Sequence, residues 1–171
     1  LAEDKPDLEI GTLAELQTFA AAVDSGSTYD GKTVILTADI DASGVVWNPI
    51  GGTADNKTFR GTFDGQGHTV TLAIKSSERY MAMFRYNHGT IKNVKVAGSI
   101  TCSTAAAGYN AMLCAWNKSD GVIDACINEA ACSLSGASSA ALVANNQGIV
   151  KNCINRGSVT AAMLSGVIAY G

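Results

Sequence analysis

The sequence predicts an all-β fold, a parallel β-helix of about five coils with one amphipathic helix at its N-terminal end. Three observations lead to this prediction: one capped helical pattern at residues 12–24, segments that recur about every 29 residues after residue 80, and short β-branched runs separated by Gly and Asn. We expect residues 1–171 to form a single domain, with the capping helix at 12–24 and the coils over 31–171.

The helix at residues 12–24 is predicted from its start signal and its apolar face. Thr12 and Glu15 have the spacing of a capping box, and Gly26 suits the end of a helix. The apolar side chains at helical spacing are Leu13, Leu16, Phe19, Ala20 and Val23. Because the end of a β-helix exposes apolar side chains and unpaired backbone groups, we expect this helix to cover the first coil.

The coils are predicted from strand patterns and from a repeat. Runs at 33–36 and 69–72 are rich in β-branched residues, and three later segments, beginning at residues 83, 112 and 141, align with one another; a fourth begins at residue 166. The equivalent apolar positions are Phe84, Leu113, Leu142 and Ile168, spaced by 29, 29 and 26 residues, and the equivalent glycines are Gly89, Gly121 and Gly148, spaced by 32 and 27. The difference predicts a turn insertion formed by Lys118, Ser119 and Asp120.

Stacked coils place equivalent residues in columns, so the alignment predicts which residues lie above one another. Counted from the three glycines, the expected inward columns are Ile91, Ile123 and Val150; Val94, Cys126 and Cys153; and Ile100, Cys132 and Val159. Two outward columns contain opposite charges, namely Lys92, Asp124 and Lys151, and Ala97, Glu129 and Arg156. Unlike charges that face each other favour this register, although each exposed pair contributes under about 1 kcal/mol.

Composition excludes several classes of partner. A net charge of -3 without any run of Lys or Arg gives no positive field for a nucleic acid. The longest apolar stretch, at residues 161–170, is too short to cross a bilayer, so we expect no direct membrane insertion. No cofactor is predicted. The sequence leaves the oligomeric state open.

Two further motifs make the chain similar to a known group of proteins. Trp47-Asn48-Pro49-Ile50-Gly51 and the segment 59–70, FRGTFDGQGHTV, accompany the Asn-x-Gly-x-Ile-x-Asn-Cys repeats, and together they resemble bacterial surface proteins with GLUG-type repeats. The resemblance covers nearly the entire chain and implies a right-handed parallel β-helix with a pectate-lyase-like architecture. Some relatives in that group precede IgA-cleaving metalloprotease domains. The Gly-Leu-x-Gly signature of the group is degraded here at residues 82–85, 111–114 and 141–144.

No residue is predicted to be catalytic or to bind a metal. The run Asp64-Gly65-Gln66-Gly67 has the composition of a tight corner. His68 and His88 lack Cys or acidic residues at ligand spacing. Asp39 and Asp41 alternate on a strand and could form a weak calcium or acid pair, but no third carboxylate stands beside them.

Cysteine and asparagine residues are interpreted structurally. The five cysteines, Cys102, Cys114, Cys126, Cys132 and Cys153, are expected to be mostly reduced and buried, with a Cys126–Cys153 bridge as the alternative; their redox state stays open. The triplets that begin at Asn56 and Asn117 match a glycosylation pattern but are interpreted as exposed turns.

These features favour a non-catalytic module that binds a glycan or a host or surface protein, in an extracellular or cell-surface setting. The alternative is a fragment of a polysaccharide-degrading β-helix enzyme, which would need two or three carboxylates on one wall. Because residue 171 falls within a new repeat, we expect the chain to be a fragment of a longer exported protein. The sequence does not identify the ligand or the residues that bind it.

Overall fold

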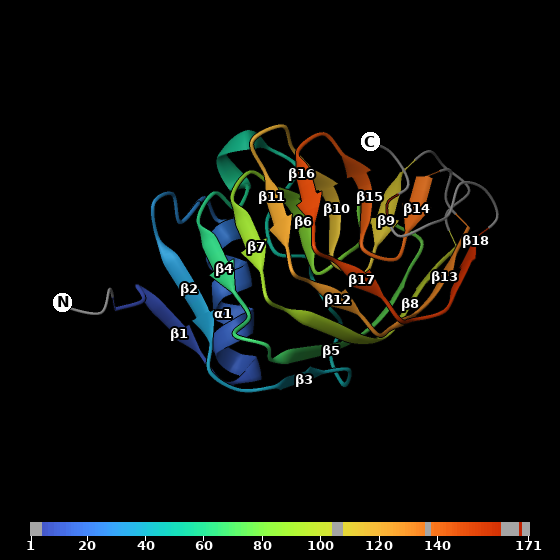
Figure 1. Ribbon diagram of the computed structural model, residues 1–171, viewed down its shortest axis with the longest axis horizontal. Helices are drawn as coiled ribbons and strands as arrows, with labels where there is room; N and C mark the ends of the chain where they lie inside the picture. Colours follow the sequence, from blue (N-terminus) through green and yellow to red (C-terminus); the bar gives the residue numbers. More distant parts are fainter. Residues whose placement is uncertain (1–4, 104–107, 136–137, 162–167, 169–171) are drawn as a thin grey trace.

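The computed structural model describes residues 5–103, 108–135, 138–161 and 168, and shows a parallel β-helix (Figure 1). Every strand pair within it is parallel. Sheet A contains six strands in coil order: β1 (Leu8–Ile10), β2 (Thr33–Leu36), β4 (Thr62–Asp64), β7 (Thr90–Lys92), β11 (Val122–Asp124) and β16 (Ile149–Lys151). Each step along sheet A is one coil, so the predicted fold class and the number of about five coils are confirmed.

The other walls of the solenoid are formed by sheets B, C and D. Sheet B contains β3 (Ile40–Ala42), β5 (Thr69–Ser76), β8 (Lys95–Cys102), β12 (Ile127–Asn128), β13 (Ala131–Leu134), β17 (Ile154–Asn155) and β18 (Val159–Ala161). Sheet C contains β6 (Phe84–Asn87), β10 (Cys114–Asn117) and β15 (Val143–Asn146), and sheet D pairs β9 (Tyr109–Ala111) with β14 (Ser138–Ala140). A short 3-10 helix, Asp55–Lys57, lies between β3 and β4.

The single α-helix, α1 (Leu13–Asp24), occupies the first coil, where sheets B and C have no strand. Thr12 and Glu15 form the predicted capping box, and Gly26 has a positive φ of 107° just after the helix. The apolar face of α1 is buried, and Phe19 packs against the rings of Phe59 and Phe63 at centroid distances of 5.8 Å. The helix therefore covers the apolar interior of the first coils, as its sequence predicts.

The predicted columns agree with the strand register. Ile123 lies between Ile91 and Val150, and Cys132 lies between Ile100 and Val159. Cys126 and Val94 are buried, whereas Cys153, in the last of these coils, is half-buried. The outward charges also meet: Lys151 contacts Asp124 at 3.4 Å and Arg156 contacts Glu129 at 3.5 Å. The column extends one coil further than predicted, because Lys92 contacts Asp64 at 3.3 Å.

The predicted register of sheet C is wrong by one residue in two places. Phe84 pairs with Cys114 and not with Leu113, and Ile168 pairs with Val143 and not with Leu142. Met112, Leu113 and Cys114 are all fully buried, so the apolar pattern alone does not determine which of them stands beside Phe84. The repeated Leu113–Leu142 spacing is right, since Cys114 pairs with Val143. The other members of the fourth segment, residues 166 and 167, lie outside the described residues.

The turn insertion is also shorter than predicted. Asn117 stands beside Asn87, and Val122 stands beside Thr90. Five positions separate the first residue of each pair from the second in one coil and three in the other, so two residues are inserted, not three. We refer to residues 118–120 as the insertion loop.

Candidate ligand-binding surface

Four aromatic side chains gather outside the hydrophobic core. Tyr86 of β6 and Trp116 of β10 are register partners in adjacent coils, with ring centroids 5.4 Å apart. Tyr80 contacts Tyr86 at 5.6 Å and Tyr109 at 5.9 Å, and Tyr109 contacts Trp116 at 5.3 Å. The four rings thus form a closed circuit, here called the aromatic cluster. Tyr86 is buried, whereas the other three rings are partly exposed.

Lys118, the first residue of the insertion loop, covers this cluster. Its Nζ atom lies 3.4 Å from the centroid of the Trp116 ring and 4.4 Å from that of Tyr86, the geometry of a cation–π contact. Loss of hydration lowers the pKa of Lys118, an effect that Asp55 partly offsets. Burial raises the pKa of Tyr86 to about 12, and the neighbouring Tyr80 adds to that shift. Tyr86 is therefore a neutral phenol at physiological pH.

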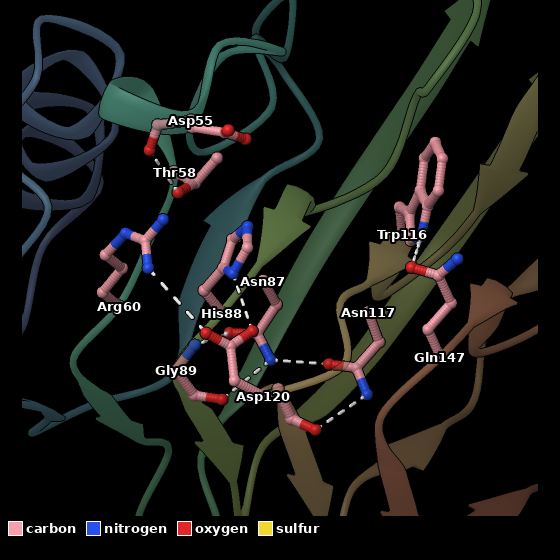
Figure 2. A network of polar contacts seen from close by, with 11 residues as sticks. Asp55, Thr58, Arg60, Asn87, His88, Gly89, Trp116, Asn117, Asp120 and Gln147 are labelled. Carbon is pink, nitrogen blue, oxygen red and sulfur yellow. Dashed lines mark hydrogen bonds and ion pairs between the residues drawn. The ribbon is translucent and has the colours of Figure 1, made fainter.

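A ladder of asparagines fixes the strand ends that carry these rings. The side-chain amide of Asn87 donates to Oδ1 of Asn117 at 2.8 Å, and the amide of Asn117 donates to Oδ1 of Asn146 at 2.8 Å. Asn87 also holds the Gly89 backbone through its amide and its carbonyl oxygen. Because Trp116 immediately precedes Asn117, the ladder determines where the indole emerges (Figure 2).

The far end of the insertion loop is anchored by ion pairs. Asp120 contacts Nδ1 of His88 at 2.7 Å and the Arg60 guanidinium at 3.8 Å, so it joins the insertion loop to the preceding coil (Figure 2). The loop cannot move away from the aromatic cluster without breaking these contacts. Trp116 is itself oriented by a hydrogen bond of 3.1 Å from its Nε1 to Oε1 of Gln147 in the next coil.

Two polar groups next to the cluster lack a partner among the described residues. Nε of Arg85, which adjoins Tyr86 in β6, is buried and donates no hydrogen bond. Oδ1 of Asn145, which stands beside Trp116 in β15, is buried and accepts none. A buried polar atom without a partner costs roughly 1–3 kcal/mol, so both atoms mark positions where the structure tolerates unsatisfied polarity.

The candidate residues of the tight corner after β4 serve the fold. Oδ1 of Asp64 accepts hydrogen bonds from the Gln66 amide at 2.9 Å and from Asn93 at 3.1 Å. A Cβ atom added at Gly65 would lie 2.6 Å from Val94, so only glycine fits there. Gln66 and Gly67 both have positive φ. The predicted interpretation as a turn is confirmed.

The other acid and histidine candidates lie apart from one another. Asp39 contacts Nδ1 of His68 at 3.2 Å and accepts from the Thr69 amide, while Asp41 accepts from Ser43. His88 belongs to the separate pair with Asp120 described above. Within the described ranges, no three His, Cys, Asp or Glu side chains gather as a metal site requires.

All five cysteines are free in the structure, and four are buried. Burial raises the pKa of Cys114 to about 12 and that of Cys102 and Cys132 to about 11. Cys153 differs, because a hydrogen bond from the Cys126 thiol lowers the pKa of its own thiol. The backbone amide of Cys126 lies 3.5 Å from Sγ of Cys153, so the two residues are stacked as predicted.

One interpretation of the glycosylation-like triplets is wrong. Asn56 is exposed, but Asn117 is fully buried in the ladder and its amide is engaged by two acceptors, Asn146 and Gly121. The sequence contained a signal for the ladder, because Asn87, Asn117 and Asn146 precede the equivalent glycines. It also contained a signal for the aromatic cluster: Tyr86 and Trp116 are 30 residues apart, close to the repeat length.

Comparisons with known proteins support the fold and leave the family open. Compared with models of known protein families, the chain matches none. It is 41% identical over 80 residues to halomucin from Haloquadratum walsbyi, a match that covers 40% of this chain and 1% of halomucin. In the part of the chain that the structure describes, no helix combines the length and the apolar character needed to cross a bilayer.

Among solved structures, the fold resembles that of a "putative immunoglobulin A1 protease" from Bacteroides ovatus, with a TM-score of 0.63 and 18% identity. The alignment covers 95% of this chain and 60% of that protein. At this identity the likeness concerns the fold, and it places the chain among proteins with a parallel β-solenoid.

Proposed function

We propose that the chain is a non-catalytic β-helix module of an extracellular or cell-surface protein and that the aromatic cluster binds a glycan. The observation that carries this proposal is the position of four aromatic rings outside the core, joined across adjacent coils. Apolar groups gathered at a surface are typical of binding sites, and flat rings with a polar edge suit the apolar face of a pyranose, whose hydroxyls need nearby polar partners.

The arrangement is rigid enough to select a ligand. Trp116 is fixed by Gln147 on one side and by the asparagine ladder on the other, so a sugar would meet an indole whose orientation is set before binding. Preorganisation of this kind reduces the entropy lost on association. The local similarity to halomucin and the resemblance to surface proteins with GLUG-type repeats support the extracellular or cell-surface setting.

A glycan array followed by calorimetry on the best ligand tests the proposal. We expect Trp116→Ala to weaken binding by about tenfold or more, equivalent to about 1.4 kcal/mol, and Trp116→Phe to weaken it less because a ring remains. Val46→Ala is the matched control, since Val46 is 91% exposed and lies away from the cluster. An array without any bound glycan, or unchanged affinity of Trp116→Ala, would contradict the proposal.

The same samples test the enzymatic alternatives. The ligand is recovered after incubation and analysed for new reducing or unsaturated ends, and IgA1 is incubated with the protein because of the name of the solved neighbour. We expect intact glycan and intact IgA1. Turnover of either would replace the proposed binding role with a catalytic one.

A further inference from the structure

The charge of Lys118 is not neutralised by an ion pair with any carboxylate in the described part of the chain. Its Nζ atom instead rests on the faces of Trp116 and Tyr86. The carboxylate in the same loop, Asp120, is occupied by His88 and Arg60. Asp55 acts on Lys118 only through the field of its charge, without a close contact. The aromatic cluster therefore carries a partly desolvated positive charge.

Other cationic side chains flank the same cluster. Arg85 directly precedes Tyr86 and keeps a buried Nε donor without an acceptor. Arg79 directly precedes Tyr80, and its side chain packs over Gly108, next to Tyr109. Glu78 is the acidic residue closest in sequence, and it is exposed. The balance of charge around the four rings is positive, in a chain whose net charge is -3.

A ligand that stacks on Trp116 must displace the ammonium group from the indole face. A neutral sugar would end the cation–π contact without replacing it. A sugar with a carboxylate on its own ring would place that anion beside the indole it covers, where the displaced ammonium can reach it. Charge-assisted hydrogen bonds of this type are among the stronger ones in proteins.

We propose that the ligand of the aromatic cluster is an acidic saccharide of the hexuronic-acid class, stacked on Trp116 and held by Lys118 through its carboxylate. Lys118 is then the residue that determines specificity, and Arg85 is a second donor for the same ligand. This inference rests on the proposed glycan-binding function and adds the class of sugar to it.

Calorimetric titration with a hexuronic-acid hexasaccharide and with its carboxyl-reduced, neutral form tests the inference. We expect the acidic form to bind at least about tenfold more tightly and its affinity to fall as salt is added. Lys118→Gln should reduce the preference to about twofold or less. Lys75→Gln, an exposed lysine on β5 in sheet B, should leave it unchanged.

The outcomes separate the two proposals. Equal or tighter binding of the neutral form, still lost in Trp116→Ala, would overturn the inference and leave glycan binding intact. An equal effect of Lys75→Gln and Lys118→Gln would also overturn it, because the preference would then reflect overall charge. If neither hexasaccharide binds and the array detects no other glycan, both proposals fail. Thermal unfolding of each variant shows whether it is folded.

Discussion

Ala125 occupies a backbone conformation that suits its side chain poorly. At the corners that follow β4, β7, β11 and β16, the residues with positive φ are Gln66, Asn93, Ala125 and Asn152, with φ between 51° and 54°. Asn tolerates this left-handed region because its short polar side chain can bond locally. Asn93 donates to Asp64 and Asn152 donates to Asp124, whereas Ala125 has no group that could compensate.

Ala125→Gly should therefore stabilise the protein. Glycine adopts positive φ without strain, and this gain exceeds the added flexibility of the unfolded chain, so we expect the free energy of unfolding to rise by about 0.5–1 kcal/mol. Chemical denaturation measures the change. Ala131→Gly is the control, since Ala131 is an exposed strand residue without positive φ. It should lower stability by a similar amount, and a loss in both variants would show that the corner is not strained.

The asparagine ladder links β6, β10 and β15 where sheet C meets the next corner. Asn117 is its central member, because it accepts from Asn87 and donates to Asn146 and to the carbonyl of Gly121. Buried amides that are bonded on both sides stabilise a structure, but each becomes costly when a partner is removed. The ladder thus holds both the strand ends and the base of the insertion loop.

Asn117→Ala should lower the free energy of unfolding by about 2–4 kcal/mol, because it leaves Oδ1 of Asn146 and the Gly121 carbonyl without their donor. Denaturant titration provides the measurement, with Asn56→Ala as the control at an exposed asparagine. Asn117→Asp should be similarly destabilising, since a carboxylate cannot donate to Asn146. If Asn117→Asp were as stable as the parent protein, the ladder would have no energetic role.

The sequence predicted the elements that depend on local chemistry and on the repeat. The capping box of α1 and the columns through Ile91 and Ile100 were found because helix starts and coil spacing leave regular patterns. The register at Phe84 was missed because adjacent buried residues offer several equivalent choices. The aromatic cluster was missed for another reason: Tyr80 and Tyr109 lie outside the strands of sheet C, and only the folded chain brings them to Tyr86 and Trp116.

The solenoid as a whole is asymmetric from end to end. At the N-terminal end Phe19 of α1 is buried against Phe59 and Phe63, and these rings continue through contacts with Phe84 at 5.5 and 5.2 Å. Toward the other end Ile149 is 55% exposed and Ile154 is 46% exposed. Since each coil contacts mainly its neighbours, stability should vary along the axis.

Phe19→Ala tests how far the stabilising effect of the helix extends. Removing this buried ring should cost about 3–5 kcal/mol where the cavity forms. Because coils interact with their neighbours, hydrogen exchange measured by mass spectrometry should accelerate most in β1, β2 and β4 and least in β11 and β13. Gln17→Ala, on the exposed face of α1, is the control and should leave exchange unchanged. An equal acceleration in every coil would show instead that the solenoid unfolds as one cooperative unit, in which case α1 stabilises the distant aromatic cluster as strongly as it stabilises the coils it covers.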